Sequence, residues 1–141
     1  MKKIIAVLFM LFILVGCGPT EKMAFGKSND KVIEDISSQE KALGWTYAEI
    51  QIKKLYGLDK IKIKGDSENL KVMRMPDDKN SETGEEYKDI YSVRGNYVFQ
   101  DKVYNFSMLY SLTDEDHYKV LYLVSNYDDS KSISVPLESD N

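Results

Sequence analysis

The pattern of apolar and polar residues changes three times along the chain. Residues 4–15 are an unbroken apolar run, residues 29–43 place apolar side chains at helical spacing, and from residue 45 onward apolar and polar residues alternate. Alternation with a period of two is typical of strands that have one buried face. The pattern therefore predicts one helix followed by a series of antiparallel strands.

The predicted helix spans residues 29–43. Asn29 or Asp30 can cap its first turn, because a short side-chain oxygen accepts the free N–H groups there. Gly44 is the expected C-terminal stop, and Trp45, directly after it, is expected to plug the core. The apolar side of this helix, which we expect to pack on the sheet, consists of Val32, Ile33, Ile36 and Leu43.

The alternating segments predict the strands of the sheet, and glycines and charged runs separate them. Residues 77–87 are expected to form a charged, turn-rich loop, in which Gly84 does not fall at the sixth position of a calcium-binding loop. Gly95 suggests a bulge or bend between two short strands. The expected strands lie near residues 49–53, 60–64, 69–73, 89–93, 97–100, 103–112, 117–126 and 133–137.

The last hairpin carries the strongest register information. A five-residue loop over residues 113–117, or its bulged equivalent, pairs Leu112 with Tyr118 and joins two apolar faces, whereas a slip by one residue would swap every side chain between faces. The opposite face then holds Leu109, Leu121 and Leu123. These leucines are either covered by another element, which we expect, or exposed as candidate partner-binding residues.

Together these elements predict an α+β fold, with one N-terminal helix packed in the concave face of a curled antiparallel sheet. The tyrosines, ten in the chain, are expected to be half-buried core residues of this sheet. The alternative is that a stripe of tyrosines lines a ligand groove.

The N-terminal residues predict a lipid anchor. Lys2 and Lys3 precede the apolar run of residues 4–15, which is long enough for a signal peptide and too short to span a bilayer. Residues 14–17 (LVGC) match the lipobox pattern, in which Cys17 receives a diacylglyceryl group. We therefore expect residues 1–16 to be removed, residues 17–28 to form a tether, and residues 29–141 to form one domain on the extracytoplasmic face of the cell membrane.

Charge and composition indicate which partners are unfavourable. The formal charge of −4 would become −6 without Lys2 and Lys3, so nucleic acid is an unfavourable partner. Basic residues prevail from residue 47 to 75, and acidic residues from 76 to 141. The lysines of the first stretch could face anionic lipid or cell wall, but their alternation with apolar residues favours the solvated face of strands.

The residues offer no catalytic constellation. Cys17 is the sole cysteine and His117 the sole histidine, in an acidic loop that we interpret as a solvated turn rather than a pH-sensitive or metal-touching site. A zinc site needs three or four ligands, which these residues rarely supply. We therefore expect no catalytic residue, no metal and no cofactor.

Three segments resemble the cystatin-like-fold lipoproteins of Gram-positive bacteria: the lipobox, residues 40–45 (EKALGW) and the hairpin of residues 104–110 (YNFSMLY) and 117–123 (HYKVLYL). The resemblance implies a helix wrapped by a four- or five-stranded antiparallel sheet. Some members of this family are carried on integrative and conjugative elements, where a surface lipoprotein can act in exclusion of redundant transfer. The family offers no catalytic residues, and the glycine-flanked inhibitory loop of true cystatins has no clear match.

The leading functional hypothesis is a non-enzymatic interaction module, held at the membrane by its lipid and acting on a membrane or surface protein. An exclusion or immunity-type role is its specific form. The alternative is a small-molecule or lipid binder with a lipocalin-like cup, which requires a deep apolar pocket lined by tyrosines. An enzyme would instead need a pocket with converging Asp, His or Tyr groups, and a lone loop histidine disfavours it.

Overall fold

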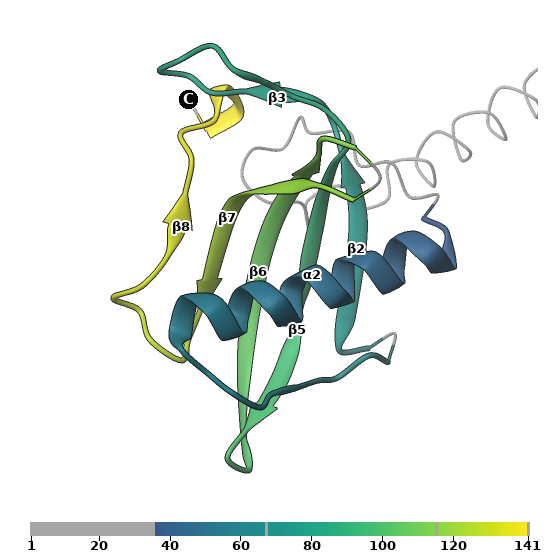
Figure 1. Ribbon diagram of the computed structural model, residues 1–141, viewed down its shortest axis with the longest axis vertical. Helices are drawn as coiled ribbons and strands as arrows, with labels where there is room; N and C mark the ends of the chain where they lie inside the picture. Colours follow the sequence, from purple (N-terminus) through teal and green to yellow (C-terminus); the bar gives the residue numbers. More distant parts are fainter. Residues whose placement is uncertain (1–35, 67, 115, 141) are drawn as a thin grey trace, which may run out of the picture.

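The computed structural model describes residues 36–66, 68–114 and 116–140 of the chain. In this part, one helix (α2, Ser38–Tyr56) lies across the concave face of a curled antiparallel sheet (Figure 1). The sheet has the strand order β1-β5-β6-β7-β8, and β2 also pairs with β5. The predicted α+β class, with a helix packed on an antiparallel sheet, is confirmed.

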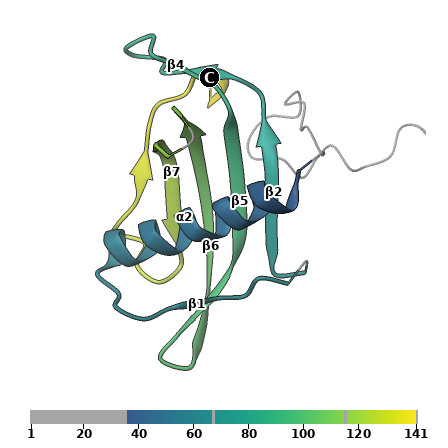
Figure 2. The same ribbon diagram turned by 45° about the vertical axis from the view of Figure 1, so that its right-hand side comes forward.

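The strands of this sheet follow the expected segments from residue 60 onward. The 45° view in Figure 2 shows β1 passing below the helix to reach the lower end of β5. A second, two-stranded sheet (β3, Asp78–Lys79; β4, Glu86–Tyr87) replaces the expected loop, and a short helix (η2, Glu138–Asp140) ends the described chain. The strands of the main sheet are β1 (Lys62–Ile63), β2 (Leu70–Met75), β5 (Ile90–Phe99), β6 (Lys102–Leu112), β7 (Tyr118–Ser125) and β8 (Ile133–Ser134).

The predicted bounds of the helix are wrong. Residues 29–35 lie outside the described residues, and α2 begins only after Ser37, whose side chain accepts a hydrogen bond from the Glu40 N–H at 3.2 Å. In return, the Ser37 N–H donates to Glu40 Oε2 at 2.8 Å, which completes a capping box. The helix continues through the strand expected near residues 49–53 and ends at Gly57, which has a left-handed φ of 67°. Its buried residues recur at helical spacing: Gly44, Tyr47, Ala48, Ile52 and Tyr56.

Gly44 is a contact point and not the end of the helix. A Cβ atom built on it would lie 3.1 Å from Val93 Cγ2 and 3.2 Å from Val72 Cγ2. These distances are shorter than an ordinary van der Waals contact, so the missing side chain lets the helix backbone approach the sheet closely. Gly95, expected to mark a bulge, is also a close contact: it pairs in regular register with Leu70 and Phe106, and a Cβ there would lie 2.7 Å from the Asn69 carbonyl oxygen.

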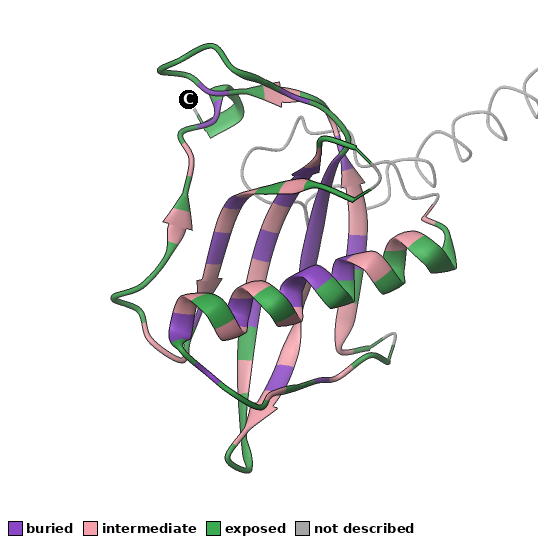
Figure 3. Cartoon of the chain, viewed as in Figure 1, coloured by how far each residue is buried: buried purple, intermediate pink, exposed green. Residues whose placement is uncertain are grey.

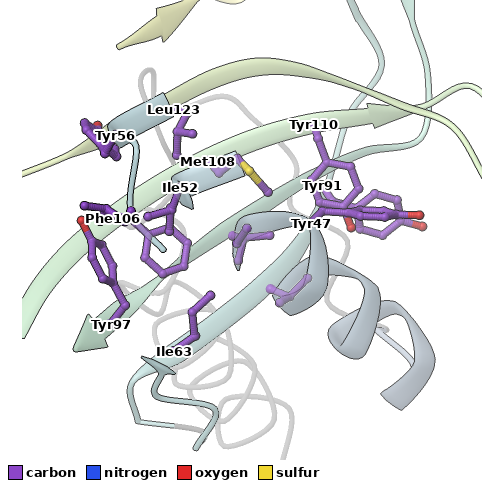
Figure 4. Close-up of a cluster of buried hydrophobic side chains, with 14 residues drawn as sticks. Tyr47, Ile52, Tyr56, Ile63, Tyr91, Tyr97, Phe106, Met108, Tyr110 and Leu123 are labelled. Carbon is purple, nitrogen blue, oxygen red and sulfur yellow. The ribbon is translucent and has the colours of Figure 1, made fainter. Parts of the chain in front are cut away.

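The main core fills the space between α2 and the sheet (Figures 3 and 4). Three tyrosines lie together at one end of it: Tyr110 is stacked on Tyr91 with ring centroids 5.4 Å apart and is edge-on to Tyr47 at 5.3 Å. Desolvation by burial raises the pKa of Tyr97 to about 12, and the Tyr97 hydroxyl shares a hydrogen bond of 2.9 Å with Ser125. These tyrosines are therefore core residues, as the alternation pattern predicts.

The hairpin register is confirmed where the loop begins, and a β-bulge changes it further along. Leu112 pairs with Tyr118, but after the bulge Leu109 pairs with Tyr122, so the intervening residue of β7 is shifted. Leu123 consequently turns into the main core, while Leu121 remains in a second cluster. That second cluster also contains Met75, Tyr87, Ile90 and Leu137, with Leu109 and Val135 packed against it.

The close contact at Gly44 predicts a specific sensitivity to side-chain volume. Gly44→Leu should lower the free energy of unfolding by about 1–3 kcal/mol, because the added atoms overpack the contact with Val72 and Val93. The matched control is Thr46→Leu at an exposed position of the same helix, which should change stability by less than about 0.5 kcal/mol. Urea denaturation checks both, and equal effects of the two variants would contradict the contact.

A hydrogen bond between Tyr91 and Glu40 joins the first turn of α2 to β5 and makes stability depend on pH. The Tyr91 hydroxyl donates to Glu40 Oε1 at 2.7 Å, and this bond, followed by the bonds from Ser37, lowers the pKa of Glu40. The stabilisation from a depressed carboxyl pKa is present above the unfolded value of 4.5 and is lost as the pH falls through the folded pKa.

Tyr91→Phe should therefore raise the pKa of Glu40 towards its ordinary value. The stability difference between the native protein and the variant should be full at pH 7 and shrink as the pH falls below 4.5. NMR titration of the Glu40 carboxyl and urea unfolding at both pH values measure this. Tyr97→Phe, which removes a hydroxyl that bonds to Ser125 instead of a carboxylate, should leave the Glu40 titration unchanged.

Candidate functional site

A groove lies between α2 and the outer edge of β2. Its first part is a pocket of about 570 Å³, lined on the helix side by Ser38, Lys41, Ala42 and Trp45. These positions follow the spacing i, i+3, i+4, i+7, so they share one face of the helix. On the sheet side the lining is residues 70–73, four successive residues of β2. Because successive side chains of a strand point to opposite faces, this lining shows that the pocket faces the edge of β2.

The second part of the groove adjoins the first and has a volume of about 480 Å³. The two parts share Trp45 and Gly65, and we call them together the edge groove. Trp45 is 39% exposed, so the expectation that it plugs the core is wrong. Its indole lies against the backbone of Gly65, where an added Cβ would stand 2.4 Å from the ring atom Cζ3.

The backbone of β2 has one edge without a strand partner in the described part of the chain. The Asn96 N–H donates to the Asn69 carbonyl at 3.1 Å, and hydrogen-bonding direction alternates along a strand. Lys71 and Met73 therefore direct their backbone groups towards β5. The N–H and C=O groups of Val72 and Arg74 point the other way, to the side on which the edge groove lies.

The edge groove is basic although the chain as a whole is acidic. Four lysines line it, and none of the four has an ion-pair partner among the described residues: Lys41, Lys62, Lys64 and Lys71. Its two carboxylates are engaged locally. Glu49 pairs with Lys53 at 2.6 Å, and hydrogen bonds from Asn69, the side-chain bond first, lower the pKa of Asp66. The free charge in the groove is therefore positive.

The residues that the sequence singled out lie elsewhere. Cys17 is outside the described residues. Leu121 and Leu123 are fully buried, in two different clusters, and Leu109 is partly buried. The three leucines do not share a face, because the bulge in β7 separates them. Leu121 and Leu123 therefore offer no surface to a partner, and the expectation that these leucines are covered holds for both, while Leu109 is covered only in part.

His117 lies in an exposed turn, in accordance with its interpretation as a solvated residue. Its ring Nδ1 is 2.7 Å from Asp114 Oδ1, and the hydrogen bond to this carboxylate raises the pKa of His117. Within residues 36–140, as far as they are described, no group of three or more His, Cys, Asp or Glu side chains could hold a metal ion. The same residues include no helix long and apolar enough to cross a membrane.

Comparison with known proteins gives no family for this chain. No protein-family model, no curated protein and no solved structure matches it. The resemblance to cystatin-like-fold lipoproteins therefore stays a prediction from the sequence.

The sequence nevertheless contains a signal for the edge groove. Residues 37–40 (SSQE) have Ser and Glu at the two ends of a capping box, as S-x-x-E requires. A helix that starts there places Lys41 and Trp45 four residues apart on one face, with Ala42 beside them. Lys71 could not be added from the sequence, because its position beside this helix face depends on the tertiary fold.

The contact between Trp45 and Gly65 can be measured directly, since Trp45 is the chain's one tryptophan. Gly65→Ala should displace the indole, shift its fluorescence emission to longer wavelength and increase quenching by acrylamide. Gly84→Ala is the matched control, because an added Cβ there meets nothing within 4 Å. The control should lose about 1 kcal/mol of stability to its positive φ of 73° but keep the native emission. Unchanged emission in Gly65→Ala would contradict the contact.

Proposed function

We propose that this protein is a membrane-anchored extracytoplasmic lipoprotein that acts as a non-enzymatic interaction module and binds a membrane or surface protein through the edge groove. The observation that carries the proposal is the combination of an exposed tryptophan, Trp45, with an edge of β2 that no other described strand pairs with. Tryptophan is among the residues most enriched in the centres of protein interfaces. An unpaired strand edge is a ready template for another polypeptide.

The anchor is the second part of the proposal, and it rests on the sequence. Two acyl chains on Cys17 would give stable membrane attachment, whereas one chain is marginal. The tether after the cysteine, residues 18–28, extends at most about 35–40 Å. A partner of the domain would therefore lie close to the membrane. An exclusion or immunity-type factor of a conjugative element is the specific role that the family resemblance suggests.

The alternative of a lipocalin-like cup is less well supported. It needs an apolar pocket lined by tyrosines on the concave face of the sheet. In the described residues this face is covered by α2, and Tyr47, Tyr91, Tyr97 and Tyr110 are buried there. The residues that line the edge groove, by contrast, include no tyrosine; they are one tryptophan, apolar side chains, and polar and charged residues.

A photo-crosslinking amino acid at Ala42 tests the proposal in the full-length chain within membranes. Ala42 is exposed and lines the edge groove, whereas Val103, the matched control position, is 54% exposed on β6. We expect a discrete protein adduct from position 42 and none from position 103. Cys17→Ser in the same chain should abolish incorporation of labelled palmitate and reduce the adduct, because the domain is no longer held at the membrane. Absence of a specific adduct at position 42 would overturn the proposed function.

A further inference from the structure

We propose that the edge groove binds an extended, acidic peptide segment of its partner, which adds to the sheet as a new strand beside β2. This inference rests on the proposed function and states the chemistry of the partner. It follows from three features of the groove: the direction of backbone groups in β2, the side chains on either side of that edge, and the charge.

The backbone of β2 supplies the main hydrogen bonds. Val72 and Arg74 direct their N–H and C=O groups away from β5, as the bond from Asn96 to Asn69 establishes. Leu70 has the same direction, but its N–H already donates to the Asp66 carbonyl at 2.9 Å. A strand that pairs with Val72 and Arg74 would therefore lie alongside the part of β2 that lines the groove. Main-chain bonds of this kind provide affinity in strand addition without specifying sequence.

The side chains beside this edge favour alternating residues in the added strand. Residues of that strand that point to the helix side would meet Ala42 and Trp45, an apolar surface. Their neighbours in sequence would point to the other face, where Lys71 and Met73 of β2 project. The groove therefore selects an apolar residue at every second position, with polar residues between.

The charge of the groove selects acidic residues. Its lysines, which include Lys41 and Lys71, have no ion-pair partner in the described structure, so carboxylates of a bound segment would supply counter-charges that the described residues do not. A second copy of this chain is a poor occupant, because edge-to-edge pairing of two β2 strands would bring the Lys71 side chains together. An acidic segment of a different protein satisfies both the backbone and the charge.

Selection from a displayed library of random eight-residue peptides tests the inference. We expect the selected peptides to alternate apolar residues with Asp or Glu. The affinity of the best peptide should fall at least tenfold for Lys41→Glu combined with Lys71→Glu, and likewise for Trp45→Ala. The matched control combines Lys88→Glu with Lys102→Glu, two exposed lysines that do not line the groove, and should change the affinity less than twofold. Circular dichroism verifies that each variant is folded.

Amide hydrogen exchange distinguishes strand addition from binding by side chains alone. The selected peptide should slow exchange at Val72 and Arg74 at least tenfold, while Lys71 and Met73, which already bond to β5, should change little. Unchanged exchange at Val72 and Arg74 would overturn strand addition, and selection of basic peptides or of none would overturn the acidic segment.

Binding of phosphatidylglycerol vesicles tests whether the groove contacts anionic lipid instead of a peptide. If they bind with the same dependence on Lys41 and Lys71 and displace the peptide, the groove is a lipid-contact site and the inference is wrong.

Failure of the inference can be distinguished from failure of the proposed function. If position 42 gives an adduct but no peptide slows exchange at Val72, the inference is wrong and the proposed function stands. If position 42 gives no specific adduct, the proposed function itself is wrong.

Discussion

The contact between Gly44 and the valines of two neighbouring strands determines how the rest of this domain is arranged. Because residue 44 has no side chain, the backbone of α2 comes within contact distance of Val72 on β2 and Val93 on β5. This approach brings Ala48 and Ile52 of the helix fully into the core, where both are inaccessible to solvent. It also fixes the line along which the neighbouring flank of the helix, with Lys41 and Trp45, passes the edge of β2, and so it forms the edge groove.

The β-bulge in β7 solves a different problem, which is to cover both faces of the sheet. A strictly alternating strand would place Leu121 and Leu123 on the same face, opposite the helix. The bulge instead sends Leu123 into the main core and leaves Leu121 in the second cluster, with Tyr87 of β4 and Leu137 near the C-terminal end. Each leucine is thereby fully buried by the elements that the structure describes.

The sequence predicts the class of fold, most strands and the start of the hairpin register, because these depend on local alternation and loop length. The sequence does not predict the bounds of the helix correctly, because Gly44 has the local signature of a C-terminal stop. Glycine within a helix costs about 0.5–1 kcal/mol relative to alanine, and the tertiary contact with Val72 and Val93 offsets that cost.

The placement of the helix then decides how its flanking residues are interpreted. The apolar residues after Trp45 fit both periods: Ile50 and Ile52 alternate as in a strand, yet Ala48, Ile52 and Tyr56 recur at helical spacing. Ending the predicted helix at Gly44 separated Trp45 from Lys41 and hid the face that they share, and with it the candidate site. The β-bulge in β7 also cannot be predicted from the alternation of apolar and polar residues, because a bulge changes which residue is paired with which and leaves the sequence pattern unchanged.

The location of the edge groove matters for a domain that we propose to be tethered to a membrane. Anionic lipid attracts lysines near its surface at about 1 kcal/mol each, so the charge of the groove alone would not distinguish a membrane from a protein. The backbone does distinguish them. A lipid headgroup cannot supply the alternating donors and acceptors that Val72 and Arg74 present, whereas an extended polypeptide supplies both at the spacing of a strand. Within the described structure, lysines without an ion-pair partner lie beside a strand edge without a strand partner. This combination is more specific than either feature alone, and it favours an acidic protein segment over the bilayer.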